Sequence, residues 1–476
     1  MVDVAIIGAG VVGGFIAREL SKYELSVCLI EKENDVAMGA TKANSAIVHA
    51  GFDAKVGTLK AKFNVLGSKM MESVAEELGV KYKNNGSIVV GFDEDDRKVL
   101  EELLERGKKN GVEGLIILEK DELKNLEPNI SDKVKCALYA PTGAIICPYE
   151  LTVAAVGNAM DNGAELLRNF KVDSIKKEND AFVISSSAGE VKARYIVNAA
   201  GLYSDEIAKL VGDDSFTVKP RRGEYFILDS ECGALAKTTI FRTPSKMGKG
   251  ILVSPTVDGN VILGPTAEDM EDKEDKKVTQ KGLNDVKCQA SDYISNVPFN
   301  KVITTFTGLR AVGSTGDFII EESKVAKGFI NVAGIESPGL TSAPAICGYV
   351  AELLENSGLE LKKKANFNGK REPHDAFRHM SIEEKNELIK KEPSYGRIVC
   401  RCEEVTEGEI LAAIRRNPKP LDLDGVKRRT RSGMGRCHGG FCGPNVQGLI
   451  AKELSLNYEE VTKFGRNSKV IFEKIR

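Results

Sequence analysis

A glycine-rich turn close to the start of the chain is the feature that most constrains the fold. Gly8, Gly10 and Gly13 form the pattern G-x-G-x-x-G directly after the short apolar segment VDVAII. The segment FIARELSKYE follows with helical spacing of its apolar residues, and SVCLIEKE is typical of a second strand. Strand, turn, helix and strand make a βαβ unit, which predicts an α/β fold with a parallel sheet.

The glycines and an acidic residue together indicate a bound dinucleotide. The first glycine makes the tight turn, the second lets the backbone approach a pyrophosphate, and the third packs the helix on the strand. The pyrophosphate then lies at the helix N-terminus, where free N–H groups and the helix dipole favour anions. Glu31 ends the second strand, at the offset of about 20 residues where an acid binds a ribose hydroxyl. An acid there favours FAD or NAD over NADP; the alternative is a turn that only packs a helix.

Four of the ten cysteines lie in two short stretches near the other end of the chain. Cys400 and Cys402 form C-x-C, and Cys437 and Cys442 form C-x4-C. Thiolates are soft ligands that suit zinc or iron–sulfur clusters. The C-x-C spacing is tight for a structural zinc site but suits two ligands on one side of a cluster. The alternatives to a cluster are a zinc ion and a redox switch or vestigial site. His438 is interpreted as a neighbour, because four thiols already suffice.

The overall composition narrows the function classes. The formal net charge is −2 over 476 residues, which argues against a nucleic-acid binder because such proteins usually carry a basic stripe or tail. No apolar run approaches the roughly 20 residues of a transmembrane helix. The N-terminus goes straight into a strand, without the basic start of a signal peptide. We therefore expect a cytoplasmic protein, in which clustered thiols stay reduced and bind metal or carry electrons.

Changes in composition divide the chain. Residues 358–395 are rich in lysine and glutamate and are interpreted as a linker, after which the composition changes abruptly at CRCEE. Before the linker we expect helices near 93–111 and 150–167, a strand-rich stretch near 181–264, and a strand, turn and helix at 327–354. A chain of this length suits two or three domains.

The first three quarters of the chain resemble the D-amino-acid-oxidase-like, FAD-dependent oxidoreductases. The similarity covers about residues 1–355 and rests on three separated segments in the family's order: GATKANSAIVHAGFDAKVGTLKAKFN, YIVNAAGLYSDEIAKLVG and AGIESPGLTSAPAICGYV. It implies an oxidoreductase domain over 1–357, in which an α/β, Rossmann-like FAD-binding domain is interleaved with an α+β substrate domain. The implied FAD-binding parts are about 1–85, 149–215 and 309–357, and the implied substrate parts are about 86–148 and 216–308.

The resemblance also implies which residues contact FAD. They lie in the first glycine turn, after the second strand, in the NAAG segment, and in the last turn with the helix that follows it. The implied set is Gly8, Gly10, Gly13, Gly14, Glu31, Lys32, Thr41, Asn44, Ser45, Val172, Ala200, Gly201, Gly334, Ser337, Pro338, Gly339, Leu340 and Thr341.

A flavin enzyme that oxidises a C–OH group also needs a base for the hydroxyl proton and a charge clamp for the substrate. His49 is the candidate base, because the resembling segment places it near the flavin and the ordinary pKa of histidine, about 6.5, suits proton acceptance. The alternative is a structural histidine that holds a loop. Arg310, in TGLRAVGSTGDFI, is the candidate for binding a substrate anion, with a surface or interdomain ion pair as the alternative. The implied substrate side also includes Glu224, Tyr225 and Lys249.

The C-terminal cysteine segment resembles the small, helical 2Fe-2S domain of bacterioferritin-associated ferredoxin. The resemblance assigns Cys400, Cys402, Cys437 and Cys442 as cluster ligands, in a domain over about 396–455 that is followed by a tail over 456–476. A flavin takes two electrons at once, whereas an iron–sulfur cluster passes them singly. The combination implies a dehydrogenase rather than an oxidase. Its acceptor is expected to be a protein subunit, a flavoprotein or an iron–sulfur protein, that could also hold the enzyme at a membrane.

Two groups within the family resemble the chain, and they differ in substrate. The segments NSAIVHAG, GTLKAKF and RGEY favour the L-2-hydroxyglutarate dehydrogenases, whereas the cysteine domain, with RRTRSGMGRC, favours the anaerobic-type glycerol-3-phosphate dehydrogenase subunits. The latter usually have His-Gly-Gly-x-Arg-Tyr around the position of His49, where this chain has HAGFDAK. The expected reaction is oxidation of sn-glycerol 3-phosphate to dihydroxyacetone phosphate. The alternatives are a 2-hydroxy acid dehydrogenase, an amine or opine dehydrogenase, and a non-catalytic iron–sulfur module.

Overall fold

A mostly parallel sheet forms around the first strand in the computed structural model, which describes residues 1–244, 250–373, 377–465 and 467–473. Its parallel strands lie in the order β20 (Phe329–Ala333), β12 (Gly189–Asn198), β1 (Val2–Ile7), β2 (Val27–Ile30) and β9 (Glu165–Leu167). The antiparallel additions are β11 (Ala181–Ser186) and β10 (Ser174–Glu178) beside β12, and β19 (Ile319–Glu322) beside β20. The βαβ prediction is confirmed, because β1 and β2 are parallel neighbours joined through helix α1 (Val11–Leu20).

Helices packed on one another form the largest core, next to this sheet. They are α1, α2 (Leu59–Leu78), α5 (Pro148–Asp161) and α8 (Gly339–Asn356). Glycines permit their close approach: a β-carbon on Gly14 of α1 would lie 3.0 Å from Val156 of α5. A β-carbon on Gly67 of α2 would lie 2.0 Å from the carbonyl oxygen of Thr341 on α8. These two contacts therefore set how closely α1 packs on α5, and α2 on α8, next to the glycine turn.

Helix α2 is absent from the sequence-based expectations, and its N-terminus explains why. Thr58 caps it locally, since its Oγ1 accepts the N–H of Ala61 at 3.2 Å. The carboxylate of Asp317 accepts the N–H groups of Leu59 and Lys60 at 2.8 and 3.0 Å. Two of the free donors at the helix start are thus satisfied by a residue far away in the sequence.

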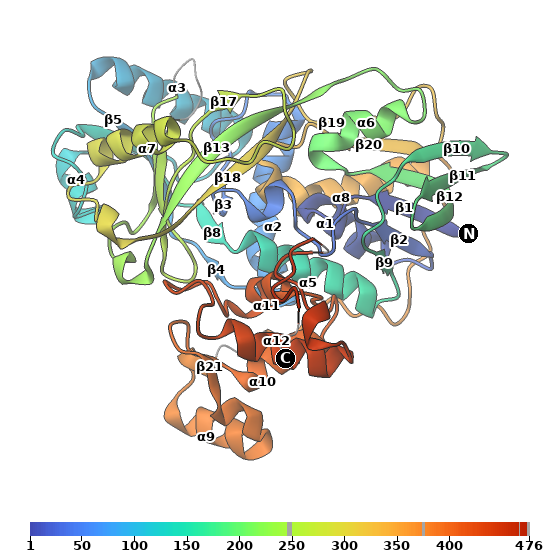
Figure 1. Cartoon of the computed structure of the whole chain (residues 1–476). Helices are drawn as coiled ribbons and strands as arrows, with labels where there is room; N and C mark the ends of the chain where they lie inside the picture. The colour runs from blue at the N-terminus through green and yellow to red at the C-terminus, as the bar shows by residue number, and fades with distance from the viewer. Residues whose placement is uncertain (245–249, 374–376, 466, 474–476) are drawn as a thin grey trace.

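A second sheet lies beside the first and is assembled from two separate parts of the chain (Figure 1). Its strands are β5 (Ser87–Gly91), β6 (Ile116–Glu119), β7 (Cys136–Ala140), β13 (Val218–Leu228), β14 (Thr239–Arg242), β15 (Leu252–Pro255), β16 (Val261–Gly264), β17 (Glu268–Asp269) and β18 (Val302–Gly313). Helices α3 (Glu94–Asn110), α4 (Lys120–Leu126) and α7 (Gln280–Tyr293) pack on it. The interleaved α+β fold is thereby confirmed, with β18 running past residue 308, where we expected this part to end.

A small third sheet links the two larger parts. It consists of β3 (Ile47–Val48), β8 (Ala144–Ile146) and β4 (Tyr82–Lys83), with β8 in the middle. Helix α5 begins two residues after β8 ends. The third sheet therefore connects the loop around His49 with the start of α5.

The C-terminal part of the chain forms a small unit next to α5 (Figure 1, orange to red). It contains β21 (Ile398–Cys400), β22 (Val405–Thr406), α10 (Glu407–Arg415), α11 (Leu423–Thr430) and α12 (Gly443–Leu454). Val399, Ile410, Val426, Val446 and Ile450 form its own buried core. The predicted small, helical C-terminal fold is confirmed.

The segments on both sides of this unit are more structured than we expected. The expected linker contains helix α9 (Ile382–Lys391), and its buried Arg371 donates to the carbonyl oxygen of Val153 on α5 at 3.3 Å. The expected tail also packs, since Val461 is buried and the N–H of Leu423 donates to the carbonyl oxygen of Thr462 at 3.1 Å. Among the described residues, no helix combines the length and apolar character needed to cross a bilayer.

Candidate active site

A cavity of about 1460 Å³ opens between the two large sheets, beyond the carboxyl ends of β1 and β2. Pockets for small ligands usually measure about 300–1,000 Å³, so this one has room for an extended cofactor and a small substrate. Most of the predicted residues line it, namely Gly8, Gly10, Glu31, Lys32, Thr41, Asn44, Ser45, His49, Val172, Ala200, Gly201, Glu224, Tyr225, Arg310, Ser337, Pro338, Gly339 and Leu340. Gly13, Gly14, Gly334 and Thr341 are not part of the lining. Lys249 lies outside the described residues.

The glycine turn brings the start of α1 to the cavity. Gly8 has a φ of +108°, and a β-carbon there would lie 2.4 Å from the carbonyl oxygen of Ala199. A β-carbon on Gly13 would lie 1.9 Å from the carbonyl oxygen of Gly8, so Gly13 serves the packing of helix on strand rather than the cavity wall. The N–H of Val11 donates to Oγ1 of Thr41 at 3.0 Å. The first turn of α1 thus faces the cavity, where its N–H groups and dipole favour a pyrophosphate.

Glu31 supports the glycine turn and also faces the cavity. Its two carboxylate oxygens accept the N–H groups of Ala9 and Glu33 at 2.9 and 3.0 Å. Burial raises the pKa of Glu31 above its usual range despite these two bonds. The carboxylate keeps lone pairs for a ribose hydroxyl, because two oxygens offer about four acceptor sites. Lys32 next to it lies 3.7 Å above the ring of Tyr203.

His49 follows β3 and stands opposite the start of α8. Its Nε2 lies 3.2 Å from Oγ of Ser337. Its backbone is held from two helices, because its N–H donates to Oγ1 of Thr341 at 2.9 Å and its carbonyl oxygen accepts from Asn64 at 2.6 Å. The imidazole is 5.8 Å from the ring of Phe241. The fixed backbone aims a titratable nitrogen into the cavity, as a general base requires.

Arg310 and Tyr225, the residues predicted to contact the substrate, line the cavity from β18 and β13 of the second sheet. Nη2 of Arg310 donates to the carbonyl oxygen of Thr266 at 2.7 Å, while its buried Nε has no partner among the described residues. The hydroxyl of Tyr225 lies 3.3 Å from Oγ of Ser45, and its ring stacks on Phe306 with 4.5 Å between centroids. Burial raises the pKa of Tyr225, so its hydroxyl remains a neutral donor. A buried guanidinium with an unsatisfied N–H is suited to an anion.

Glu224 lines the cavity, but its carboxylate is already engaged within the protein. It accepts the N–H and the hydroxyl of Thr279, the residue that caps α7, with the hydroxyl at 3.2 Å. It also accepts the hydroxyl of Thr266 at 3.4 Å. A substrate role for Glu224 would have to compete with this structural one.

The four clustered cysteines meet in the C-terminal unit. Cys400 ends β21, and Cys442 stands at the start of α12. Sγ of Cys402 lies 3.8 Å from Sγ of Cys400 and 3.8 Å from Sγ of Cys437. A tetrahedral metal with metal–sulfur bonds of about 2.3 Å holds its sulfurs roughly 3.8 Å apart. The spacing therefore fits thiolate ligands of a metal centre.

The surroundings favour the thiolate form of Cys400 and Cys437 and oppose it at the other two thiols. Burial raises the pKa of Cys402, and the hydrogen bond to Cys400 together with burial raises the pKa of Cys442. Hydrogen bonds from Cys442 and from backbone N–H groups lower the pKa of Cys400 to about 5. Burial opposes ionisation of Cys437, but backbone N–H groups such as that of Gly439 lower its pKa overall. A β-carbon on Gly435 would lie 2.6 Å from Sγ of Cys402, so the backbone approaches the sulfur directly. Such N–H groups are typical of iron–sulfur sites.

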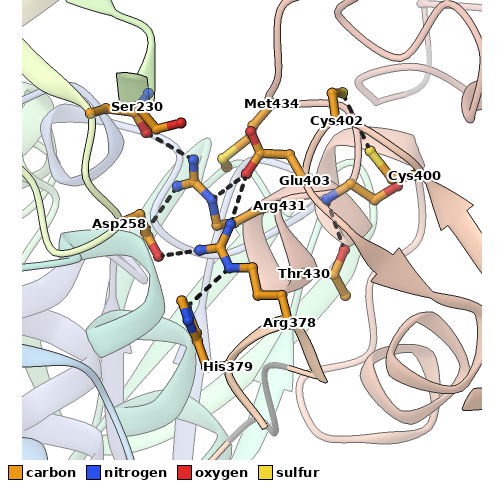
Figure 2. A network of polar contacts seen from close by, with 12 residues as sticks. Ser230, Asp258, Arg378, His379, Cys400, Cys402, Glu403, Thr430, Arg431 and Met434 are labelled. Carbon is orange, nitrogen blue, oxygen red and sulfur yellow. Dashed lines mark hydrogen bonds and ion pairs between the residues drawn. The ribbon is translucent and has the colours of Figure 1, made fainter. Parts of the chain in front are cut away.

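A buried ion network lies beside the cysteines and joins the C-terminal unit to the second sheet (Figure 2). Asp258, in the turn between β15 and β16, accepts from Arg431 at 2.9 Å and from Arg378 at 3.1 Å. Glu403, which follows Cys402, accepts from the same two arginines at 2.8 and 3.3 Å. Only 3% of the Asp258 side chain is exposed, and the charge of Arg431 keeps its pKa below the usual range although burial opposes this.

The cavity and the thiols fit two cofactors, and comparison with known families agrees. The model of the family "FAD dependent oxidoreductase" matches residues 3–353, and that of the "BFD-like [2Fe-2S] binding domain" matches residues 398–452. The chain belongs to the FAD dependent oxidoreductase family. It uses FAD and a 2Fe-2S cluster, and it is an oxidoreductase.

Individual relatives are similar over different lengths. A glycerol 3-phosphate dehydrogenase of Caloramator mitchellensis is 50% identical over 99% of this chain and 98% of its own length. A glycerol 3-phosphate oxidase of Mycoplasma genitalium is 33% identical over 77% of this chain and 97% of its own. The solved FAD-bound L-α-glycerophosphate oxidase of Mycoplasma pneumoniae has a TM-score of 0.75 and 32% identity, covering 78% of this chain and 98% of its own.

Sequence reasoning did not find the residues that join the two cofactor sites. Asp35 lies four residues after Glu31 and pairs with Arg428 and Arg429 of α11, and Asp258 pairs with Arg431. The arginines were visible as a group in RRTRSGMGRC, beside the predicted cluster ligand Cys437. Their acidic partners lie hundreds of residues away, and no local pattern marks them.

Proposed function

We propose that the protein is a glycerol-3-phosphate dehydrogenase, which oxidises the secondary alcohol of sn-glycerol 3-phosphate to dihydroxyacetone phosphate. The observation that carries this proposal is the 50% identity to the Caloramator mitchellensis protein of that name, over 99% of the chain. The identity runs through both the cavity and the cysteine unit. The Mycoplasma genitalium oxidase matches only 77% of this chain, so the cysteine unit supports a dehydrogenase over an oxidase.

In the proposed reaction, different side chains of the cavity bind the substrate anion and accept the hydroxyl proton. Bound FAD supplies the acceptor for the hydride that leaves the carbon. Arg310 binds the phosphate through the part of its guanidinium that lines the cavity, and the hydroxyl of Tyr225 donates to the same anion. His49 accepts the hydroxyl proton at Nε2, while Thr341 and Asn64 hold its backbone in place. The anion contacts thereby set the position of the reacting carbon.

The cysteine unit provides the exit for electrons. The four thiols hold the 2Fe-2S cluster, which supplies a centre that passes electrons singly. Cys402 is exposed, and the adjacent loop presents Phe441 with 84% of its surface exposed. The acceptor is a separate protein, a flavoprotein or an iron–sulfur protein that docks at this surface. A membrane location would come from that partner.

The proposal is tested by reduction of the flavin without oxygen. The purified enzyme is mixed anaerobically with sn-glycerol 3-phosphate or L-2-hydroxyglutarate, and the visible flavin band is followed. L-2-hydroxyglutarate is the second candidate because a bovine L-2-hydroxyglutarate dehydrogenase is 32% identical over 56% of this chain. Rapid loss of the band with sn-glycerol 3-phosphate alone supports the proposal. Loss with L-2-hydroxyglutarate alone would replace it, and loss with neither would reject both.

A further inference from the structure

One side-chain contact joins the main body of the enzyme to the loop that carries the cysteines. The hydroxyl of Tyr149, in the first turn of α5, donates to Sδ of Met434 at 3.6 Å. This is an ordinary distance for a bond to sulfur, a weak acceptor. Both side chains lie in the interface between the two parts. Burial raises the pKa of Tyr149 well above its usual range, so the hydroxyl keeps its proton.

On one side, Tyr149 is connected to the wall of the FAD cavity through a few residues of backbone and one backbone hydrogen bond. Ala46 and Ile47 lie between the lining residues Ser45 and His49, and Ile47 itself lines the cavity. The N–H of Ile146 on β8 donates to the carbonyl oxygen of Ala46 at 3.0 Å. Tyr149 follows only three residues after Ile146. The path from the cavity wall to the tyrosine ring thus crosses one hydrogen bond and a few peptide units.

On the other side, Met434 belongs to the loop that touches the ligand thiols. It precedes Gly435, at which a β-carbon would lie 2.6 Å from Sγ of Cys402. The carbonyl oxygen of Gly435 accepts the N–H of His438 at 2.9 Å, which closes the turn that contains Cys437. The thioether is therefore connected through two residues of backbone to the sulfurs that hold the cluster.

The ion network keeps this contact closed. Arg431, three residues before Met434, is anchored to Asp258 at 2.9 Å and to Glu403 at 2.8 Å. Asp258 belongs to the main body, and Glu403 belongs to the cysteine unit (Figure 2). The two carboxylates hold one arginine from both sides of the interface. Movement of the cysteine unit away from Tyr149 would leave these buried charges unpaired, which is costly.

We propose that Tyr149 and Met434 form the electron bridge between the FAD cavity and the 2Fe-2S site. Electron transfer through protein weakens steeply with distance, and more steeply across empty space than along bonds. In the proposed reaction the substrate alcohol gives a hydride, which carries two electrons and one proton, to bound FAD, and its hydroxyl proton goes to His49. With both cofactors bound, the two electrons would cross the bridge singly to the cluster held by Cys400, Cys402, Cys437 and Cys442, and a one-electron acceptor protein would take up both in turn. Tyr149 and Met434 remain chemically unchanged.

A second contact offers a rival route. Nε2 of His438 lies 2.7 Å from the carbonyl oxygen of Ile303 at the start of β18, a strand that reaches the cavity at Gly308. His438 is exposed, whereas Tyr149 and Met434 are both half-buried. A less exposed contact, between a tyrosine hydroxyl and a polarisable sulfur, favours Tyr149 and Met434.

The test measures cluster reduction without any substrate. In the anaerobic holoenzyme the flavin is reduced by a light pulse with a sacrificial amine donor, and the electron paramagnetic resonance signal of the reduced cluster is followed in time. We expect Tyr149→Ala and Met434→Leu each to slow the appearance of this signal several-fold, and Tyr149→Phe to slow it less. If the two side chains act as one bridge, the double variant is no slower than the slower single variant. Tyr458→Phe removes a tyrosine hydroxyl of the cysteine unit that donates to the carbonyl oxygen of Pro444 at 2.9 Å, and this variant should leave the rate unchanged.

Two controls separate the outcomes. Iron content and the signal after dithionite reduction must match the wild type, which shows that the cluster is intact. Unchanged rates in Tyr149→Ala and Met434→Leu would overturn the proposal, and a slowed His438→Ala beside them would assign the route to the rival contact. The proposal depends on the electron exit in the proposed function but not on its substrate. If sn-glycerol 3-phosphate fails to bleach the flavin, the proposed substrate is rejected. The rates of cluster reduction after the light pulse would still test the bridge, because they need no substrate.

Discussion

Asp35 and Arg429 form a bidentate ion pair between the loop that follows β2 and helix α11, with both nitrogen–oxygen distances at 2.8 Å. Arg428 adds a third contact to the same carboxylate at 2.6 Å. Only 1% of the Asp35 side chain is exposed. Glu31, the predicted ribose ligand, begins the same loop. The nucleotide loop and the cysteine unit thus share one buried carboxylate.

Replacement of Asp35 by asparagine should loosen the cysteine unit. Burial opposes ionisation, but the charge of Arg429 holds the pKa of Asp35 well below its usual range, so the pair is ionised at neutral pH. Removing the charge leaves two buried arginines unpaired, and we expect the free energy of unfolding to fall by about 3–5 kcal/mol. Chemical denaturation followed by circular dichroism measures this. Asp95→Asn, at an exposed pair with Lys98, should change it by less than about 1 kcal/mol; equal losses in both variants would contradict the prediction.

His49→Ala should slow flavin reduction and leave FAD bound. General bases contribute about 10²–10⁴-fold to rate, and the backbone bonds of His49 to Thr341 and Asn64 do not need the imidazole. Rapid mixing with substrate under anaerobic conditions gives the rate, and the flavin absorbance after gel filtration gives the FAD content. His438→Ala removes a histidine that bonds to Ile303 instead, and the rate of flavin bleaching should not change. A wild-type rate in His49→Ala would reassign His49 to a structural role.

Arg310→Met should weaken binding of an anionic substrate. A charge-assisted hydrogen bond contributes about 1.5–3 kcal/mol, so we expect KM to rise roughly 10- to 100-fold. Arg221 on β13 lies opposite Arg310 on the neighbouring strand β18, and Arg221 is already paired with Asp269 at 2.5 Å. Arg221→Met should therefore have the smaller effect on KM. The result that would count against this role is an equal rise in both variants, or no rise in Arg310→Met.

The stability of the interface should depend on pH through Glu150. Burial, with the nearby charge of Asp258, raises the pKa of Glu150 from 4.5 to about 7. Between these two values the folded state keeps a proton that the unfolded chain has lost, so the free energy of unfolding falls as pH rises through this window. Glu150→Gln has no such proton, and its stability should be flatter across the window and higher than wild type above it. Denaturation below and above the window tests this, with exposed Glu102→Gln as the control that should follow the wild type.

Gly435→Ala should remove the cluster while the flavin stays bound. The added methyl group would lie 2.6 Å from Sγ of Cys402, so the thiol must move out of its place among the ligands. Iron analysis and the visible spectrum of the anaerobically purified variant measure the loss. Gly443→Ala, in the same unit, meets no atom within 4 Å and should retain its iron. Full iron content in both variants would show that the loop can move aside.

Local patterns predicted the parts of the molecule whose contacts are local. The turn at Gly8 and Gly13 and the acid Glu31 all belong to one βαβ unit. The contacts that require these residues lie within that unit, so the local sequence pattern is enough to predict them. Helix α2 was missed because part of its N-terminal cap comes from Asp317. Helix α9 was missed although a signal was present, since Ser381 and Glu384 form a capping box inside the expected linker.

The candidate site shows the same limit. Family resemblance placed Glu224 on the substrate side, where it does line the cavity, but only the fold reveals that its carboxylate binds Thr279, the residue that caps α7. The pairing of Arg431 with Asp258 joins residues that no sequence window contains together. Long-range ion pairs and caps depend on tertiary structure, so these positions become visible only when the chain is folded.

The short loop from Glu31 to Asp35 couples the two cofactor sites. A ligand that orders the loop by binding Glu31 also orders Asp35, the carboxylate that binds the cysteine unit. Such a coupling between two sites acts equally in both directions. Loss of FAD from the cavity is therefore expected to loosen the seat of the cysteine unit, and loss of that unit is expected to weaken FAD binding.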